Sequence, residues 1–127
     1  MVVLIDDDTD DLTILRDLAG QIGLGHPVIG FDSPLPAVDH ILAAGSRIKL
    51  IIADVNMPKL NGFEVRRKLI ESGKLFADIP FVFLSTSLTD EDLKKAKVLK
   101  AQKYYKKPNS IAEFKEILDE IKFKNGL

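Results

Sequence analysis

The sequence predicts an α/β fold in which helices cover both faces of a parallel five-stranded sheet. Stretches with helical spacing separate short apolar runs, and each stretch is long enough for a crossover between parallel strands. Strand and helix therefore alternate strictly, which favours a flavodoxin-like (βα)5 doubly wound sheet with strand order 2-1-3-4-5. The apolar runs occupy residues 2–5, 28–31, 49–53, 80–84 and 103–105.

The first two helices are predicted from their boundaries. One begins after Asp8 and Thr9, where acidic residues suit the positive end of a helix dipole. The next begins after Ser33, a capping residue followed by a proline at the first helical position, and ends at Gly45.

The second half of the chain continues the alternation. A third helix is expected over about 62–73. Thr89 begins the fourth with a partial capping box, and Ser110 with Glu113 begins the fifth with a complete one. We expect the basic tail, 122–127, to be a frayed helix end.

Length and composition limit the possible functions. The chain has 127 residues, the size of one domain, so we expect a single domain over 1–127 with no output domain. Its net charge of -1 predicts no nucleic-acid partner, and the absence of cysteine excludes disulfides and thiolate chemistry. No apolar stretch approaches the roughly 20 residues of a membrane span, and we expect a cytoplasmic protein.

Carboxylates follow two of the predicted strands at the point where each ends. Asp6 and Asp7 follow 2–5, and Asp54 follows 49–53. In the expected strand order these strands are neighbours, so the three acids meet where doubly wound sheets bind ligands. Like charges repel at that distance unless a proton, a lysine or a metal compensates them. Oxygen ligands of this kind favour Mg²⁺.

Hydroxyl and amine side chains follow two further predicted strands at the same edge of the sheet. Ser85, Thr86 and Ser87 follow the fourth predicted strand with hydroxyls, and Lys107 follows the fifth with an amine. Solubility alone does not explain why acids, hydroxyls and an amine from four strands are brought together at one edge. The pattern therefore indicates a functional site.

These motifs resemble those of the receiver domains of bacterial two-component response regulators, the family of the chemotaxis response regulator. The resemblance covers essentially the whole chain, and the motifs occur in the family's order and at its usual intervals. The matching elements are the pair Asp6-Asp7, Asp54 within Asp-x-x-Met-Pro-x-x-x-Gly, Ser85, and Lys107-Pro108.

The resemblance implies a phosphoacceptor rather than an enzyme. Asp54 would accept a phosphoryl group from a phosphohistidine of a sensor histidine kinase. Asp7 and Asp54, with the backbone carbonyl of Asn56, would hold Mg²⁺, and Asp6 would hold it through water. The partner could also be a phosphotransfer protein.

The resemblance also implies a switch. Ser85 would bind a phosphoryl oxygen, Lys107 would add positive charge, and Tyr104 occupies the position of an aromatic residue that turns inward. We expect a downstream protein to bind the face made by the fourth helix, fifth strand and fifth helix, with the chain a monomer or weak dimer. That face would include Lys94, Lys95, Lys97, Tyr104 and Lys106.

Some residues depart from the family's usual pattern. Ser85 replaces the commoner threonine, and Thr86 stands where alanine or glycine is usual. Asn56 and Ser87 lie where the family tunes hydrolysis, and we expect slow to moderate self-hydrolysis. The remaining acids near the first helix are interpreted as helix-start charges: Asp8, Asp10 and Asp11.

Three alternatives share parts of this pattern. The chain could be a relay intermediate that passes phosphate to a phosphotransfer protein. A haloacid-dehalogenase-type phosphatase would use Asp6 as nucleophile, which leaves Asp54 without a role. A flavodoxin-type FMN carrier is disfavoured because the acids after the first strand would repel a flavin phosphate.

Overall fold

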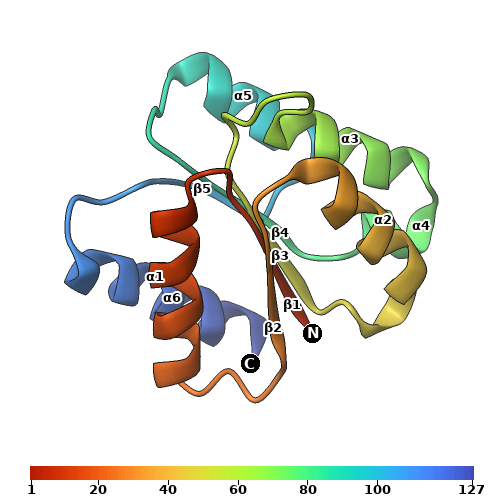
Figure 1. Cartoon of the computed structure of the whole chain (residues 1–127). Helices are drawn as coiled ribbons and strands as arrows, with labels where there is room; N and C mark the ends of the chain where they lie inside the picture. The colour runs from red at the N-terminus through yellow and green to blue at the C-terminus, as the bar shows by residue number, and fades with distance from the viewer.

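Five parallel strands form one sheet in the computed structural model, which describes residues 1–127 (Figure 1). The strands are β1 Val2–Ile5, β2 Val28–Phe31, β3 Leu50–Ala53, β4 Phe81–Ser85 and β5 Lys103–Lys106. Their order is β2-β1-β3-β4-β5, and every neighbouring pair is parallel. The predicted fold class and strand order are therefore confirmed.

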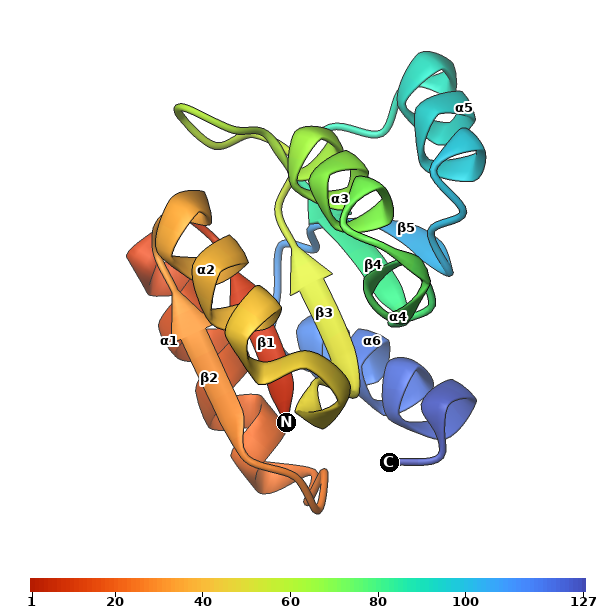
Figure 2. The ribbon, with the colours of Figure 1, turned by 90° about the vertical axis from the view of Figure 1, so that its right-hand side faces the viewer.

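Helices cover both faces of this sheet. Helices α1 and α6 lie on one face, and α2, α3 and α5 lie on the other (Figures 1 and 2). None of the helices is both long enough and apolar enough to cross a lipid bilayer. Their bounds are α1 Thr9–Gln21, α2 Pro34–Ala44, the 3-10 turn η1 Gly45–Arg47, α3 Gly62–Glu71, α4 Lys74–Ala77, α5 Asp90–Val98 and α6 Ile111–Asn125.

The sheet divides the apolar core into two layers because successive strand side chains point to opposite faces. On β5, Tyr104 packs in the layer with α2, α3 and α5, whereas Tyr105 packs in the layer with α1 and α6. Phe83 and Leu84 of β4 divide in the same way. The central strands are buried on both faces, so only their ends can present polar groups.

Side chains cap the helices that begin near the carboxyl ends of the strands. Thr89 caps α5 and Ser110 caps α6, as predicted. The complete capping box expected at Ser110 is only half formed, because Ser110 Oγ accepts from the Glu113 N–H at 3.2 Å but the Glu113 side chain does not accept from the Ser110 N–H. A complete box begins α3 instead, where the Asn61 side chain accepts from the Glu64 N–H at 2.8 Å and Glu64 accepts from the Asn61 N–H at 3.0 Å.

Two parts of the predicted element pattern were wrong. The short helix α4 makes six α-helices instead of five; it follows Gly73, at φ 123°, and carries an ion pair between Lys74 and Asp78. A single turn is too short to produce a helical period in the sequence. The basic tail is not frayed, because α6 continues to Asn125 and Lys122 Nζ donates to the Ile22 carbonyl oxygen at 2.7 Å.

Arg66 of α3 is a buried cation with no carboxylate partner. Only 3% of it is exposed, and its guanidinium lies over the ring of Phe81, 5.4 Å from the centroid. Burial lowers the pKa of Arg66, although an arginine stays charged. Its donors bind only backbone carbonyl oxygens, those of Ala77 at 2.9 Å, Leu99 at 3.0 Å, Ile79 at 3.3 Å and Lys100 at 3.4 Å. The side chain thus ties α3 to the ends of α4 and α5.

Candidate functional site

The predicted acids meet at the carboxyl edge of the sheet. Ile5 of β1 pairs with Ala53 of β3, so the residues that follow them, Asp6 and Asp54, emerge side by side. The Asp54 N–H extends the ladder by donating to the Ile5 carbonyl oxygen at 2.9 Å. Carboxylate oxygens of Asp6, Asp7 and Asp54 lie within 4.8 Å of one another. The structure therefore brings together the three acids predicted as a metal site.

These acids differ in exposure. Asp6 and Asp54 are buried, whereas Asp7 is exposed. Burial raises the pKa of Asp6 to about 7, although the Lys107 ammonium partly opposes that shift. Partial desolvation of the Asp7 carboxylate, and then the charge of Asp54, raise the pKa of Asp7. The cluster holds more negative charge than its surroundings stabilise, so it favours an additional cation.

Lys107 inserts its ammonium among these acids from the end of β5. Its Nζ lies 2.8 Å from Asp6 Oδ2 and 3.3 Å from Asp54 Oδ2, and the residue is 8% exposed. Its backbone N–H donates to the Ser85 carbonyl oxygen at 2.6 Å, which fixes the start of the side chain. Burial lowers the pKa of Lys107, but the bonds to Asp6 and Asp11 outweigh burial and raise it overall.

Asp11 is the site residue that sequence reasoning missed. Asp8 is at the start of α1, as expected, and it also caps the helix by accepting from the N–H groups of Asp10 and Asp11. The Asp11 side chain is more than a helix-start charge, because its Oδ2 lies 2.9 Å from Lys107 Nζ. A signal was available: Asp11 stands four residues before the buried Leu15, on the apolar face of the helix.

Ser85 and Asn56 form a hydrogen-bonded pair beside Asp54. Ser85 is fully buried, and its Oγ accepts from Asn56 Nδ2 at 3.1 Å. The Asn56 N–H in turn donates to Asp54 Oδ1 at 3.2 Å. The Ser85 hydroxyl therefore keeps its own hydrogen for donation. Thr86 and Ser87 follow in an exposed loop.

Tyr104 connects this loop to β5. The residue is 7% exposed, and its ring packs beside Phe83 and Phe63, with centroid distances of 6.0 and 6.4 Å. Its hydroxyl donates to the Ser87 carbonyl oxygen at 2.6 Å. Burial raises the pKa of Tyr104. The ring thus points inward and its hydroxyl contacts the loop that follows β4.

Gly62 allows α3 to begin against the backbone of Asp54. The Gly62 N–H donates to the Val55 carbonyl oxygen at 2.9 Å. A Cβ at this position would collide with the Asp54 carbonyl oxygen and would lie 3.0 Å from Val55 Cα. Only glycine permits this approach, which explains the glycine that ends the Asp54 motif.

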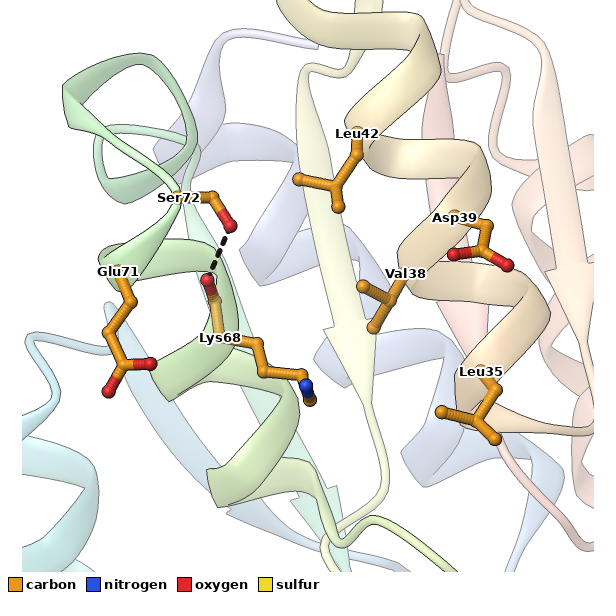
Figure 3. A pocket seen from close by; sticks show the side chains of 7 residues that line it. All are labelled: Leu35, Val38, Asp39, Leu42, Lys68, Glu71 and Ser72. Carbon is orange, nitrogen blue, oxygen red and sulfur yellow. Dashed lines mark hydrogen bonds between the residues drawn. The ribbon is translucent and has the colours of Figure 1, made fainter.

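A surface hollow lies between α2 and α3 (Figure 3). Its charged side chains are exposed, and the side-chain hydrogen bond among the lining residues runs from Ser72 Oγ to the Lys68 carbonyl oxygen at 2.7 Å. None of the predicted site residues lines it. The residues that do are Leu35, Val38, Asp39, Leu42, Lys68, Glu71 and Ser72.

The donor set at the carboxyl edge fits a hard divalent cation. Three carboxylates converge there, and desolvation and mutual repulsion disfavour the charged forms of Asp6 and Asp7. Oxygen ligands of this type suit Mg²⁺, which is bound by one or two carboxylates together with water. Asp6, Asp7 and Asp54 could therefore bind such an ion.

Known proteins share both the sequence pattern and the fold. Residues 2–119 match the response regulator receiver domain. The chain is 27% identical over 126 residues to a probable methanogenesis regulatory protein, FilR2, of Methanothrix harundinacea, covering 96% of this chain and 81% of that protein. A chemotaxis protein CheY homolog of Campylobacter jejuni is 26% identical over 121 residues, covering 94% and 90%.

A solved structure agrees with these relatives. The phosphorylated cyanobacterial phytochrome response regulator RcpA is 26% identical and superposes with a TM-score of 0.84 over 94% of this chain and 89% of that one. The match covers the residues that carry the acidic edge as well as the sheet. The chain therefore belongs to the response regulator receiver domain family.

Proposed function

We propose that Asp54 accepts a phosphoryl group from a phosphohistidine of a sensor kinase in a Mg²⁺-dependent reaction, and that phosphorylation changes the binding of a partner protein. The observation that carries this proposal is the position of the Lys107 ammonium between Asp6 and Asp54, at distances of 2.8 and 3.3 Å. The family functions in two-component signalling, which supports the same reading.

The acidic edge supplies the ligands for the ion. Asp7, Asp54 and the backbone carbonyl of Asn56 would hold Mg²⁺ directly, and Asp6 would act through water. When bound, the ion supplies the positive charge that lets a carboxylate approach an anionic phosphoryl group.

The chain's own side chains then perform the transfer. A carboxylate oxygen of Asp54 attacks phosphorus, the O–P bond forms and the N–P bond breaks, and the electron pair stays on the donor imidazole. The Lys107 ammonium binds the transferred oxygens, and the Ser85 hydroxyl donates to another. Such reactions depend on positioning and electrostatics, which a small set of residues can supply.

The contacts around Ser85 provide a route to the partner surface. A shift of Ser85 toward a phosphoryl oxygen would move the loop that contains Ser87. The carbonyl oxygen of Ser87 accepts a hydrogen bond from the Tyr104 hydroxyl. Acceptor and β5 are thus linked through two neighbouring contacts. A coupling free energy of about 1–3 kcal/mol is ordinary for such a switch.

The face of α5, β5 and α6 is the surface that we propose binds the partner. It combines exposed lysines with exposed apolar side chains, which favours a partner with acidic and apolar groups. Val98 is 79% exposed, and Leu93 and Tyr104 line a hollow of about 220 Å³ between α5 and β5. The exposed lysines are Lys94, Lys95, Lys97 and Lys106.

Incubation with Mg²⁺ and acetyl phosphate tests the acceptor directly. We expect the wild-type protein to gain the mass of one phosphoryl group, and Asp54→Asn to gain none. The exposed Asp32→Asn variant is the matched control and should behave as wild type. Loss of labelling in Asp6→Asn with retention in Asp54→Asn would contradict the proposal and favour the phosphatase alternative.

A further inference from the structure

We propose that Asp11 is a positioning residue that holds Lys107 toward α1 and so limits the share of its charge that reaches Asp54 and an incoming phosphoryl group. The inference rests on the proposed function of Asp54. It concerns how readily the acceptor reacts, which the matching motifs leave open because Asp11 lies outside them.

The Lys107 ammonium contacts three carboxylates. Lys107 Nζ lies 2.8 Å from Asp6, 2.9 Å from Asp11 and 3.3 Å from Asp54. An ammonium has three hydrogens, so three carboxylates occupy all of its donors. Asp54 has the longest of the three contacts, and Asp11 has a shorter one. Asp11 therefore competes with the acceptor for the same cation.

The backbone fixes Asp11 in this role. Its N–H donates to the Asp8 side chain at 3.2 Å, which locks the first turn of α1. Its carboxylate is 22% exposed, so it is partly shielded from solvent, whereas the Asp10 side chain is exposed. A charge in such a place interacts with its neighbours more strongly than a fully solvated one.

The charges predict two opposite effects of removing Asp11. A phosphoryl group adds negative charge beside Lys107, and a neutral residue 11 would free one donor and remove one repulsive charge. Anion binding should therefore become tighter. The same loss of a negative charge would make the acidic edge less attractive to a divalent cation, so Mg²⁺ binding should become weaker.

Asp11→Asn tests this pair of effects, with Asp10→Asn as the matched control. Binding of beryllofluoride, measured by fluorine NMR at saturating Mg²⁺, should become about tenfold tighter in Asp11→Asn, the size expected of one charge-assisted contact. Binding of Mg²⁺ alone should weaken by about threefold. Asp10→Asn should leave both affinities close to wild type. General damage to the fold would weaken both ligands together.

A spectroscopic measurement shows whether Asp11 acts through Lys107. In protein labelled with ¹⁵N-lysine, the Lys107 side-chain resonance should shift in Asp11→Asn and stay in place in Asp10→Asn. Equal beryllofluoride affinities in the two variants, or an unchanged Lys107 resonance, would overturn the inference. Failure of wild-type protein to bind beryllofluoride would instead overturn the proposed function.

Discussion

The molecule buries one cation at each end of its sheet and satisfies the two in different ways. Arg66 lies near the amino ends of β4 and β5 and binds only backbone carbonyl oxygens. Lys107 lies at the carboxyl ends and contacts three carboxylates. Backbone carbonyls carry no titratable charge, whereas carboxylates both titrate and attract a divalent cation by their charge.

The difference separates structural burial of charge from functional burial. The partners of Arg66 are parts of α4, α5 and the following turns, so its contacts hold helices in place. The partners of Lys107 are groups whose charge changes when a proton, a cation or a phosphoryl group arrives. Depth of burial alone does not distinguish these roles; the chemistry of the partners does.

The largest expected effect is on stability, at Arg66. Arg66→Met would leave four backbone carbonyls without their donor, and we expect it to lower the free energy of unfolding by about 3–5 kcal/mol. Arg67→Met, at the neighbouring exposed arginine, should change it little. Urea unfolding measures both. The Mg²⁺ affinity of the folded Arg66 variant should match that of wild type. A large loss of affinity would show that Arg66 is not a purely structural cation.

For Lys107 we expect a large effect on ligand binding and a smaller effect on stability. We expect Lys107→Met to weaken beryllofluoride binding about a hundredfold, as removal of one preorganised electrostatic donor commonly does. Lys106→Met, one residue earlier and exposed, is the control. The stability loss should be smaller than for Arg66→Met, because protons or Mg²⁺ can compensate the carboxylates. A Lys107 variant that binds beryllofluoride as wild type does would refute its role at the acceptor.

The raised pKa of Asp6 predicts a pH dependence of stability. Its folded value of about 7 exceeds the ordinary 3.8, so between those values the native protein binds more protons than the unfolded chain. The free energy of unfolding should therefore fall as the pH rises from about 4 to 7, by a few kcal/mol at most.

Asp6→Asn isolates this contribution. The variant should lose most of the decline between pH 4 and 7, because no proton is released at residue 6. Unfolding in urea at a series of pH values, without Mg²⁺, measures the slope, and Asp32→Asn is the control. Equal slopes in Asp6→Asn and wild type would show that Asp6 does not hold its proton as proposed.

The smallest effect is expected at the two tyrosines of β5. Tyr104→Phe removes the hydrogen bond to the Ser87 carbonyl and should cost about 1 kcal/mol of stability. Hydrogen exchange in the loop after β4 should also become faster. Tyr105→Phe is the matched control, because the buried Tyr105 hydroxyl has no partner, and it should be neutral or slightly stabilising. Similar losses in both variants would argue against a specific link to the loop.

Apolar runs and the residues after them were enough to predict the sheet and the acidic edge. The positions of Asp6, Asp54 and Lys107 follow from the strand ends, because parallel strands deliver their carboxyl ends to one place. The roles of Asp11 and Arg66 depend instead on which distant groups a helix turn faces. Asp11 and Lys107 are 96 residues apart in sequence, so the helical pattern could place Asp11 on the apolar face of the first helix but could not identify Lys107 as its partner.

The ends of the helices also divide into those that local sequence predicts and those that depend on distant contacts. Capping residues located the starts of α5 and α6, whereas α4 is one turn long and the end of α6 depends on a contact between Lys122 and α1. Ile111 is apolar and begins α6, yet it is exposed, because the first turn of the helix extends beyond the core. Periodicity describes the middle of a helix better than its ends.

The chain contains no tryptophan and only two tyrosines, adjacent in β5 and on opposite sides of the sheet. Its near-ultraviolet emission therefore originates mainly from one strand, with one fluorophore in each layer of the core. In Tyr105→Phe the remaining tyrosine reports the layer of α2, α3 and α5, and in Tyr104→Phe the other reports the layer of α1 and α6. Events at the carboxyl edge can thus be followed optically, layer by layer, without an added dye.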